Sequence, residues 1–262
     1  MDYTTLALNR RPHGVLEVTL NRPETHNAMS ITMIRELRDL CDALSAQNDT
    51  RAVVLTGAGR SFCAGADLRW MQEISQQSRE ARMREARELA EMLHALDTLP
   101  ALTLARVNGP AFGGAVGVIS CCDLAVASEN AVFALTEVRL GILPATISPF
   151  VVRRLGGSQA RRVMLHARRF DAEEALRLGL LSRVVAVEDL DEAVEAEVQL
   201  LLACAPESVG RTKQLIRQVE GQLPEDVRDL TIDQLADVWE HPSSKEGISA
   251  FFEKRPPAWK PE

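Results

Sequence analysis

V-N-G-P-A-F-G-G-A-V-G, from Val107 to Gly117, is the most informative segment of this 262-residue chain. A second segment, S-F-C-A-G-A-D-L from Ser61 to Leu68, has the same character. Each follows a short β-rich run and consists largely of residues with little or no side chain. Such residues let a ligand reach bare backbone, where N–H groups can face developing negative charge. Either segment alone reads as a tight turn. The pair predicts a site to which each loop contributes one N–H.

Outward from these loops, strand-like and helix-like patterns alternate. Strands are expected at Gly14–Leu20, Ala52–Thr56, Leu102–Val107, Leu124–Ala127 and Ala131–Ala134, with helices at Ser30–Leu44 and Arg79–Leu96. The second helix should place Met83, Ala86, Leu89, Ala90 and Leu93 on one face. Strands separated by helices favour parallel pairing and an α/β fold. After Pro149 the pattern is helical, with expected helices at Asp171–Leu178, Glu188–Cys204, Pro206–Val219 and Pro224–Trp239.

Three further segments, together with the two small-residue loops, make the whole chain resemble the crotonase (enoyl-CoA hydratase/isomerase) superfamily. The three are N-R-P-E-T-H-N-A-M at Asn21–Met29, T-E-V-R-L-G-I-L-P at Thr136–Pro144, and F-F-E-K-R at Phe251–Arg255. Any one of them is a weak signal, but their joint order and spacing is specific. The resemblance implies a spiral of ββα units acting on coenzyme A thioesters. It also implies a core over residues 1–200 and a C-terminal helical region over 201–262 that packs across subunits in trimers or hexamers.

The resemblance further implies which residues meet the substrate. The thioester oxygen would lie between the backbone amides of Ala66 and Gly114. Coenzyme A would contact the backbone of Glu24, Thr25, His26, Ala64, Gly65, Asp67 and Leu68. Phe251 and Lys254 would reach its nucleotide part from a neighbouring subunit. Coenzyme A is then part of the substrate, and no separate cofactor or metal is expected.

One catalytic position departs from the usual hydratase pattern. Hydratases of this superfamily usually hold the attacking water between two glutamates, and one of these matches Glu137. The other would lie three residues after Gly114, where this chain has Gly117. Apolar neighbours of Glu137 predict a low-polarity setting that raises its pKa toward the range useful for proton transfer.

A single carboxylate leaves three functions open. The first is hydration of a branched, carboxylated 2-enoyl-CoA, since the pattern resembles the single-glutamate hydratases of leucine and acyclic-terpene catabolism. The second is double-bond isomerisation with Glu137 as the sole base. The third is a non-catalytic binding protein of the same fold, although the helix after Ser30 lacks the lysines of RNA-binding relatives.

Two residues near the expected site carry two interpretations each, and two others carry a structural one. Gly117 either opens volume for a β-branch on the acyl group or simply packs against a helix. Arg139 either pairs with a substrate carboxylate or forms an internal salt bridge. Asp67 is expected chiefly as a helix N-cap, and Asp123 as a group that fixes the backbone where a strand begins.

The composition predicts a soluble cytoplasmic protein. The net charge is −7, so no global basic field attracts nucleic acid or an anionic membrane. No apolar run approaches the ~20 residues needed to span a bilayer. The N-terminus lacks the apolar core of a secretory signal. The five cysteines form no regular framework, and free thiols in a reducing compartment are expected.

Overall fold

A computed structural model describes residues 3–47, 49–220 and 242–259. Its main sheet has the strand order β1-β2-β3-β4-β6-β9. These strands are β1 (Leu6–Arg11), β2 (Val15–Leu20), β3 (Ala52–Gly57), β4 (Leu102–Val107), β6 (Leu124–Ser128) and β9 (Arg183–Val185). β1 pairs antiparallel with β2, and every later pairing in this sheet is parallel. A small sheet joins β5 (Ala111–Phe112), β7 (Val132–Ala134) and β8 (Phe170–Asp171).

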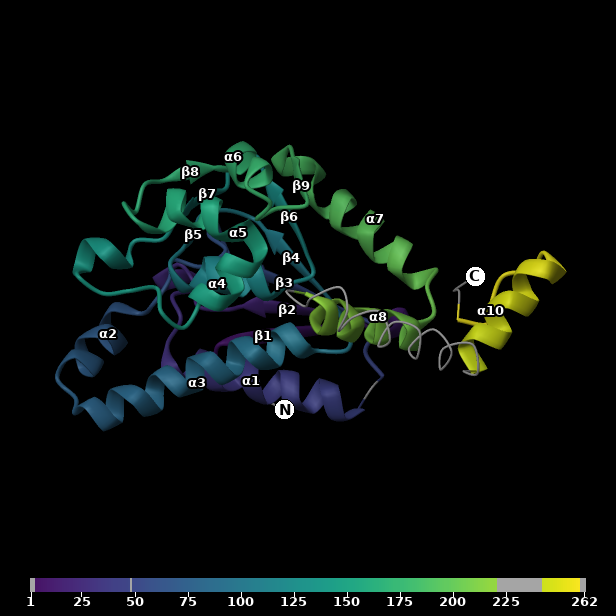
Figure 1. Cartoon of the computed structure of the whole chain (residues 1–262), viewed down its shortest axis with the longest axis horizontal. Helices are drawn as coiled ribbons and strands as arrows, with labels where there is room; N and C mark the ends of the chain where they lie inside the picture. Colours follow the sequence, from purple (N-terminus) through teal and green to yellow (C-terminus); the bar gives the residue numbers. More distant parts are fainter. Residues whose placement is uncertain (1–2, 48, 221–241, 260–262) are drawn as a thin grey trace.

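Helices cover both faces of the main sheet. They are α1 (Ile31–Gln47), α2 (Leu68–Ser75), α3 (Arg79–Thr98), α4 (Gly114–Cys121), α5 (Ser148–Met164), α6 (Ala172–Arg177), α7 (Leu190–Leu202), α8 (Pro206–Val219) and α10 (Pro242–Glu253). Alternate residues of a strand point to opposite faces. On β3, Val53 and Leu55 join the core under α1 and α3, whereas Val54 joins the core under α7. Figure 1 shows α1 and α3 side by side below the sheet.

The parallel pairing of β3 with β4 brings the two small-residue loops together. Parallel neighbours end at the same edge of a sheet, so the chain leaves both strands at one place. There Phe62 N donates to Pro110 O at 3.1 Å, and Phe112 N donates to Cys63 O at 3.0 Å. The side chain of Asn108, in the loop Val107–Gly117, fixes the chain that leads into the loop Ser61–Leu68. It donates to the carbonyls of Gly57 and Gly59, each at 2.9 Å. The meeting of the two loops, expected from the sequence, is confirmed.

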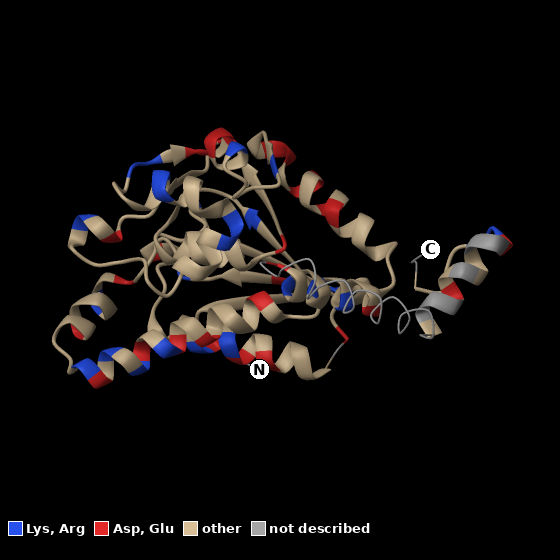
Figure 2. Ribbon diagram, in the orientation of Figure 1, with Lys and Arg blue, Asp and Glu red and all other residues tan. Residues whose placement is uncertain are grey.

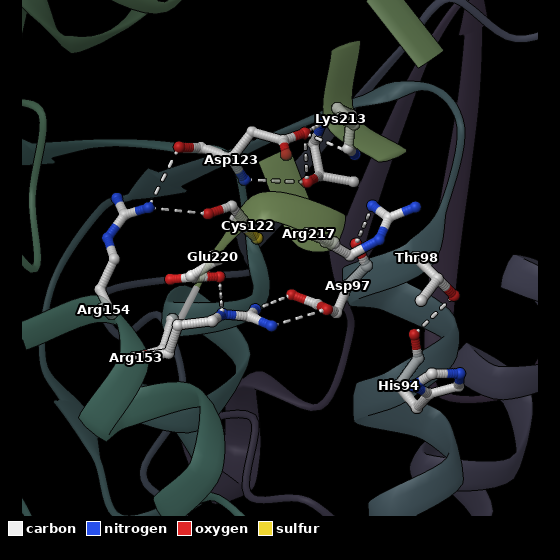
Figure 3. Close-up of polar contacts among 12 residues, drawn as sticks. His94, Asp97, Thr98, Cys122, Asp123, Arg153, Arg154, Lys213, Arg217 and Glu220 are labelled. Carbon is white, nitrogen blue, oxygen red and sulfur yellow. Dashed lines mark hydrogen bonds and ion pairs between the residues drawn. The ribbon is translucent and has the colours of Figure 1, made fainter. Parts of the chain in front are cut away.

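Ion pairs attach α8 to the core (Figure 3). Lys213 is buried; its Nζ lies 2.7 Å from Asp123 Oδ2 and donates to Ala101 O at 2.8 Å. Asp123 also accepts from the backbone N and the hydroxyl of Thr103 at the start of β4. Asp123 therefore fixes the backbone beside two strand ends, as its sequence context suggested.

Most expected elements are confirmed, among them α1, β3, β4 and α8. Asp171 caps α6 by accepting from Glu174 N at 2.7 Å. The antiparallel strand β1 was not anticipated. The boundary expected at residue 200 lies inside α7. The expected helix Pro224–Trp239 lies outside the described residues.

The apolar face expected on α3 is buried only in the C-terminal half of the helix. Met83 is 51% exposed, and full burial begins only at Met92 and Leu93. Figure 2 shows that acidic and basic residues alternate along this half of the helix. The N-terminal half of α3 therefore stands beside the core instead of packing into it.

Two other expectations concern the chain as a whole. The cysteines are free thiols, four of them buried, with Cys204 exposed. Among the residues that the structure describes, no helix is long and apolar enough to cross a membrane.

Candidate active site

A cavity of about 650 Å³ opens at the edge of the sheet where the two loops meet. Where the two loops meet, a region called the inner end below, the cavity is lined by Ala66, Gly114 and Glu137, which come from three separate segments of the chain. Its walls are predominantly apolar and come from α2, the N-terminal half of α3 and the segment 140–147. A cavity of this size, with a few polar groups at one end, fits a small-molecule site.

The backbone of Ala66 is held by its neighbours in a way that leaves its own N–H unused. Met29 N donates to Gly65 O at 2.7 Å, and Asp67 N donates to Met29 O at 2.9 Å. Gly65 has a φ of +96°, and a Cβ there would come 2.9 Å from Phe112 O, so the close approach of the loops requires glycine. Within the described residues, Ala66 N donates no hydrogen bond.

Gly114 is the first residue of α4, so its N–H has no partner within the helix. The preceding Gly113 N is used, because it donates to Ala134 O at 2.8 Å. A Cβ on Gly114 would overlap the terminal methyl of Met29. The Gly114 N–H, like that of Ala66, is therefore available to an oxygen atom in the cavity, in the part of the chain described.

The segment Asn21–Met29 holds the loop at Ser61–Leu68 in place. Asn27 is fully buried, with a φ of +56°, and its amide nitrogen donates to Ala58 O at 2.9 Å and Ser61 O at 2.8 Å. Arg22 lies 2.8 Å from Asp67 Oδ2. The other oxygen of Asp67 caps α2 by accepting from Arg69 N at 2.9 Å. The N-cap expected at Asp67 is confirmed, and its side chain is occupied by the protein itself.

Glu137 begins a short 3-10 turn, Glu137–Leu140, and its carboxylate reaches back to the glycine loop. A Cβ on Gly113 would lie 3.1 Å from Glu137 Oε1. Glu137 Oε2 is buried and has no hydrogen-bond partner within the described residues. Burial raises the pKa of Glu137 above its ordinary value, as the sequence context predicted. An uncompensated, partly desolvated carboxylate in a cavity is typical of a proton-transfer group.

The volume beside Gly117 is filled by Ile147. A Cβ on Gly117 would lie 2.7 Å from Ile147 Cβ and closer still to its Cγ2. Gly117 is buried and does not line the cavity, whereas Ile147 does. The idea that Gly117 opens room for a β-branch is therefore wrong, and the packing interpretation is correct. Ile147 thus forms the cavity wall beside Gly117, the position at which hydratases of this superfamily usually have their second glutamate.

The residues expected to contact coenzyme A form two neighbouring groups. Glu24, Thr25 and His26 lie in and after a 3-10 turn, and Ala64 N donates to His26 O at 2.9 Å. Leu68 is 80% exposed at the start of α2. None of the residues in these two groups lines the cavity. Their role in coenzyme A binding remains a prediction.

Phe251 and Lys254 do not join this site within one chain. Phe251 belongs to α10, and Lys254 follows it; Figure 1 places α10 and α2 at opposite ends of the long axis. Lys254 is exposed, with a φ of +54°.

Arg139 does not form the internal salt bridge that was the first expectation for it. It is exposed, has no salt bridge within the described residues, and does not line the cavity, so its pairing with a substrate carboxylate stays a prediction. The cation that does line the cavity is Arg82 on α3, which sequence reasoning overlooked. Its helical spacing from Ala86 and Leu89 was the available signal, because residues at i, i+4 and i+7 share one face.

This combination of a ββα-type fold with two free loop amides and a buried carboxylate defines a crotonase-type protein. The sequence profile of the enoyl-CoA hydratase/isomerase family matches residues 10–262, and the chain belongs to that family. A putative enoyl-CoA hydratase of Thermus thermophilus is 38% identical over 93% of this chain and 96% of its own length.

Solved structures agree. Pseudomonas aeruginosa AtuE superposes with a TM-score of 0.95 at 40% identity, covering 98% of this chain and 100% of AtuE. An enoyl-CoA hydratase from Shewanella pealeana has a TM-score of 0.94 at 37% identity, covering 98% and 96% of the two chains. The expected crotonase fold is confirmed.

Proposed function

We propose that this chain is an enoyl-CoA hydratase that adds water across the double bond of a 2-enoyl-CoA thioester. The observation that carries the proposal is the cavity end at which Ala66, Gly114 and Glu137 meet. Relatives named as enoyl-CoA hydratases over nearly the full length support the same reaction.

In the proposed reaction the thioester oxygen accepts hydrogen bonds from Ala66 N and Gly114 N. The Glu137 carboxylate removes a proton from water as the resulting hydroxide bonds to C3. The electron pair of the double bond moves toward the thioester oxygen, where the two N–H groups stabilise the enolate. Protonated Glu137 then delivers its proton to C2. One water is consumed, and the enzyme returns to its starting state.

The raised pKa of Glu137 suits this two-way role. A group that must both accept and donate a proton works best when its pKa lies near the working pH. A single carboxylate can therefore serve both half-steps, provided that the water is oriented by other groups. The carboxylate of the substrate is one candidate for that task.

The acyl group we propose is branched and carboxylated, of the glutaconyl type. The resemblance to single-glutamate hydratases supports this class, and the cavity volume of about 650 Å³ accommodates more than a short straight chain. Room for a branch comes from the main cavity, since Ile147 occupies the space beside Gly117.

The alternative function is isomerisation of the double bond, with Glu137 moving a proton between C4 and C2. The apolar Ile147 wall favours it, because that wall offers no second carboxylate to hold a water. In both functions coenzyme A is part of the substrate and no other cofactor takes part.

We also propose that the active assembly is a homotrimer or a homohexamer. In it, Phe251 and Lys254 reach the nucleotide end of coenzyme A on a neighbouring subunit. The position of α10 away from α2 within one chain supports this arrangement (Figure 1).

A panel of enoyl-CoA thioesters tests the function. The panel contains straight and β-methyl chains, each with and without a distal carboxylate, and products are read by mass and by loss of the enone absorbance. A gain of one water mass supports hydration. A product of unchanged mass with a shifted double bond would replace hydratase by isomerase, and no reaction with any member would contradict both.

A further inference from the structure

One charged residue lies in the apolar part of the cavity. Apart from Glu137 at the inner end, Arg82 is the only charged side chain among the described residues that line it. The walls around it include Trp70, Ile74 and Leu89. A cation retained on an apolar substrate wall suggests a substrate with a complementary group.

Arg82 has no partner of its own in the described part of the chain. Its guanidinium forms no hydrogen bond or ion pair there, and only the charge of Glu80, a fully exposed residue two positions earlier, interacts with it. Charged side chains further along the same helix are engaged instead. Glu85 accepts hydrogen bonds from Trp70 and Gln77, and Glu91 pairs with Arg38. The five guanidinium N–H groups of Arg82 are thus free to bind a ligand.

Its position sets where on the substrate that ligand group must be. Arg82, Ala86 and Leu89 line the cavity from one face of α3. An α-helix rises about 1.5 Å per residue, so Arg82 stands about 10 Å along the axis from Leu89. Ala86 between them has only a methyl group, which leaves space along this wall. Arg82 marks an end of this wall, and Ala66, Gly114 and Glu137 lie at the inner end of the cavity.

We infer that Arg82 binds a carboxylate at the distal end of the acyl group and selects acid-terminated acyl-CoA thioesters over their uncharged counterparts. A guanidinium matches the two oxygens of a carboxylate with parallel hydrogen bonds, which gives direction as well as attraction. The inference deepens the proposed function and rests on it: the same cavity must hold the acyl group.

Binding of saturated thioesters tests this without depending on catalysis. Isothermal titration would compare adipoyl-CoA with hexanoyl-CoA, and suberoyl-CoA with octanoyl-CoA, so that each pair differs only in the terminal carboxylate. Arg82→Gln should lower the affinity ratio of each acid-terminated thioester to its counterpart by about tenfold, the scale of a hydrogen bond to a charged group. Arg82→Lys should restore part of the ratio. Added salt should reduce the ratio in the wild type, because the pair is solvent-exposed.

Arg84→Gln is the matched control. Arg84 is an exposed arginine of the same helix, but it lines a different depression, with Arg35 and Glu88. Its replacement should leave every ratio unchanged. If Arg82→Gln lowers the affinity for all four thioesters by the same factor, Arg82 contacts coenzyme A itself and the inference is overturned. An unchanged ratio in both pairs overturns it as well. Failure of the proposed function is a separate result, seen as no water addition or isomerisation on the enoyl-CoA panel while these binding ratios still respond to Arg82.

Discussion

The Glu137 carboxylate lies directly against the backbone of Gly113. A Cβ atom added to Gly113 would lie only 3.1 Å from Glu137 Oε1. Gly113 also has a φ of +53° and is the N-cap of α4. The same residue therefore permits the turn into the helix and the approach of the carboxylate to the loop amides. The proposed proton-transfer group and the Gly114 N–H are positioned by one local structure.

Replacing the carboxylate tests its role in the reaction. Glu137→Gln keeps the shape but removes the proton acceptor, and turnover should fall by about 10²-fold or more. Binding of saturated thioesters should persist. Glu129, an exposed glutamate in the turn between β6 and β7, gives the control Glu129→Gln, for which unchanged turnover is expected. A folded Glu137→Gln enzyme with near-normal turnover would refute the assignment.

The same substitution should alter how stability depends on pH. Burial raises the pKa of Glu137, so the folded protein binds more protons than the unfolded chain at pH values between the ordinary and the raised pKa. The contribution of Glu137 to the free energy of unfolding is thus fully present below its ordinary pKa, about 4.3. That contribution is lost as the pH rises through the raised pKa of the folded state. Glu137→Gln should therefore be more resistant to urea than the wild type near pH 8. The difference should shrink toward pH 4. A constant difference across this range would show that the carboxylate is not desolvated.

A pair of substitutions at Gly114 separates the N–H from the side chain. Gly114→Pro removes the donor, and proline is tolerated at the first position of a helix. The loss of one such donor typically lowers turnover by about 10²–10³-fold. Gly114→Ala keeps the N–H and only displaces the flexible end of Met29, so a much smaller loss is expected. Equal turnover in the two folded variants would mean that the thioester oxygen is held elsewhere.

Gly117 and Ile147 should be energetically coupled. Gly117→Ala places a methyl where Ile147 already packs, and overfilling a core costs about 1–3 kcal/mol of unfolding free energy. Ile147→Ala removes the nearest atom, so the double variant should be less destabilised than the sum of the single ones. Denaturant titration of all four proteins measures this coupling. Strict additivity would contradict the packing described for this pair.

The contact of α8 with the core depends on Lys213 (Figure 3). Lys213→Met would leave Asp123 without its cation, and breaking a buried pair from one side costs about 3–5 kcal/mol. Asp123 is partly exposed, so the lower end of that range is expected, measured by denaturant unfolding. Arg217→Met is the comparison, since within the described residues Arg217 forms a single hydrogen bond, to Asp97 O at 3.4 Å. A loss no larger than that of Arg217→Met would mean that the pair contributes little.

Local patterns in the sequence were enough for the regular elements and for part of the site. The strand runs before Ala58 and Asn108, the start of α6 at Asp171, and the helix of α8 follow from periodicity and turn chemistry between near neighbours. Glu137 and the loop residues Ala66 and Gly114 came from motifs that match the family. These signals are local, and each can be read within a few residues.

Tertiary structure alone decided what fills the space between those segments. Gly117 and Ile147 are thirty residues apart, and the motif around Gly117 carries no sign of the side chain that packs against it. Arg82 appeared to begin an ordinary charged helix, and only the placement of α3 beside α2 put it on the cavity wall. Local sequence determines backbone conformation and the chemistry that each segment carries, whereas volume and electrostatic partnership depend on distant residues that the folded chain brings into contact.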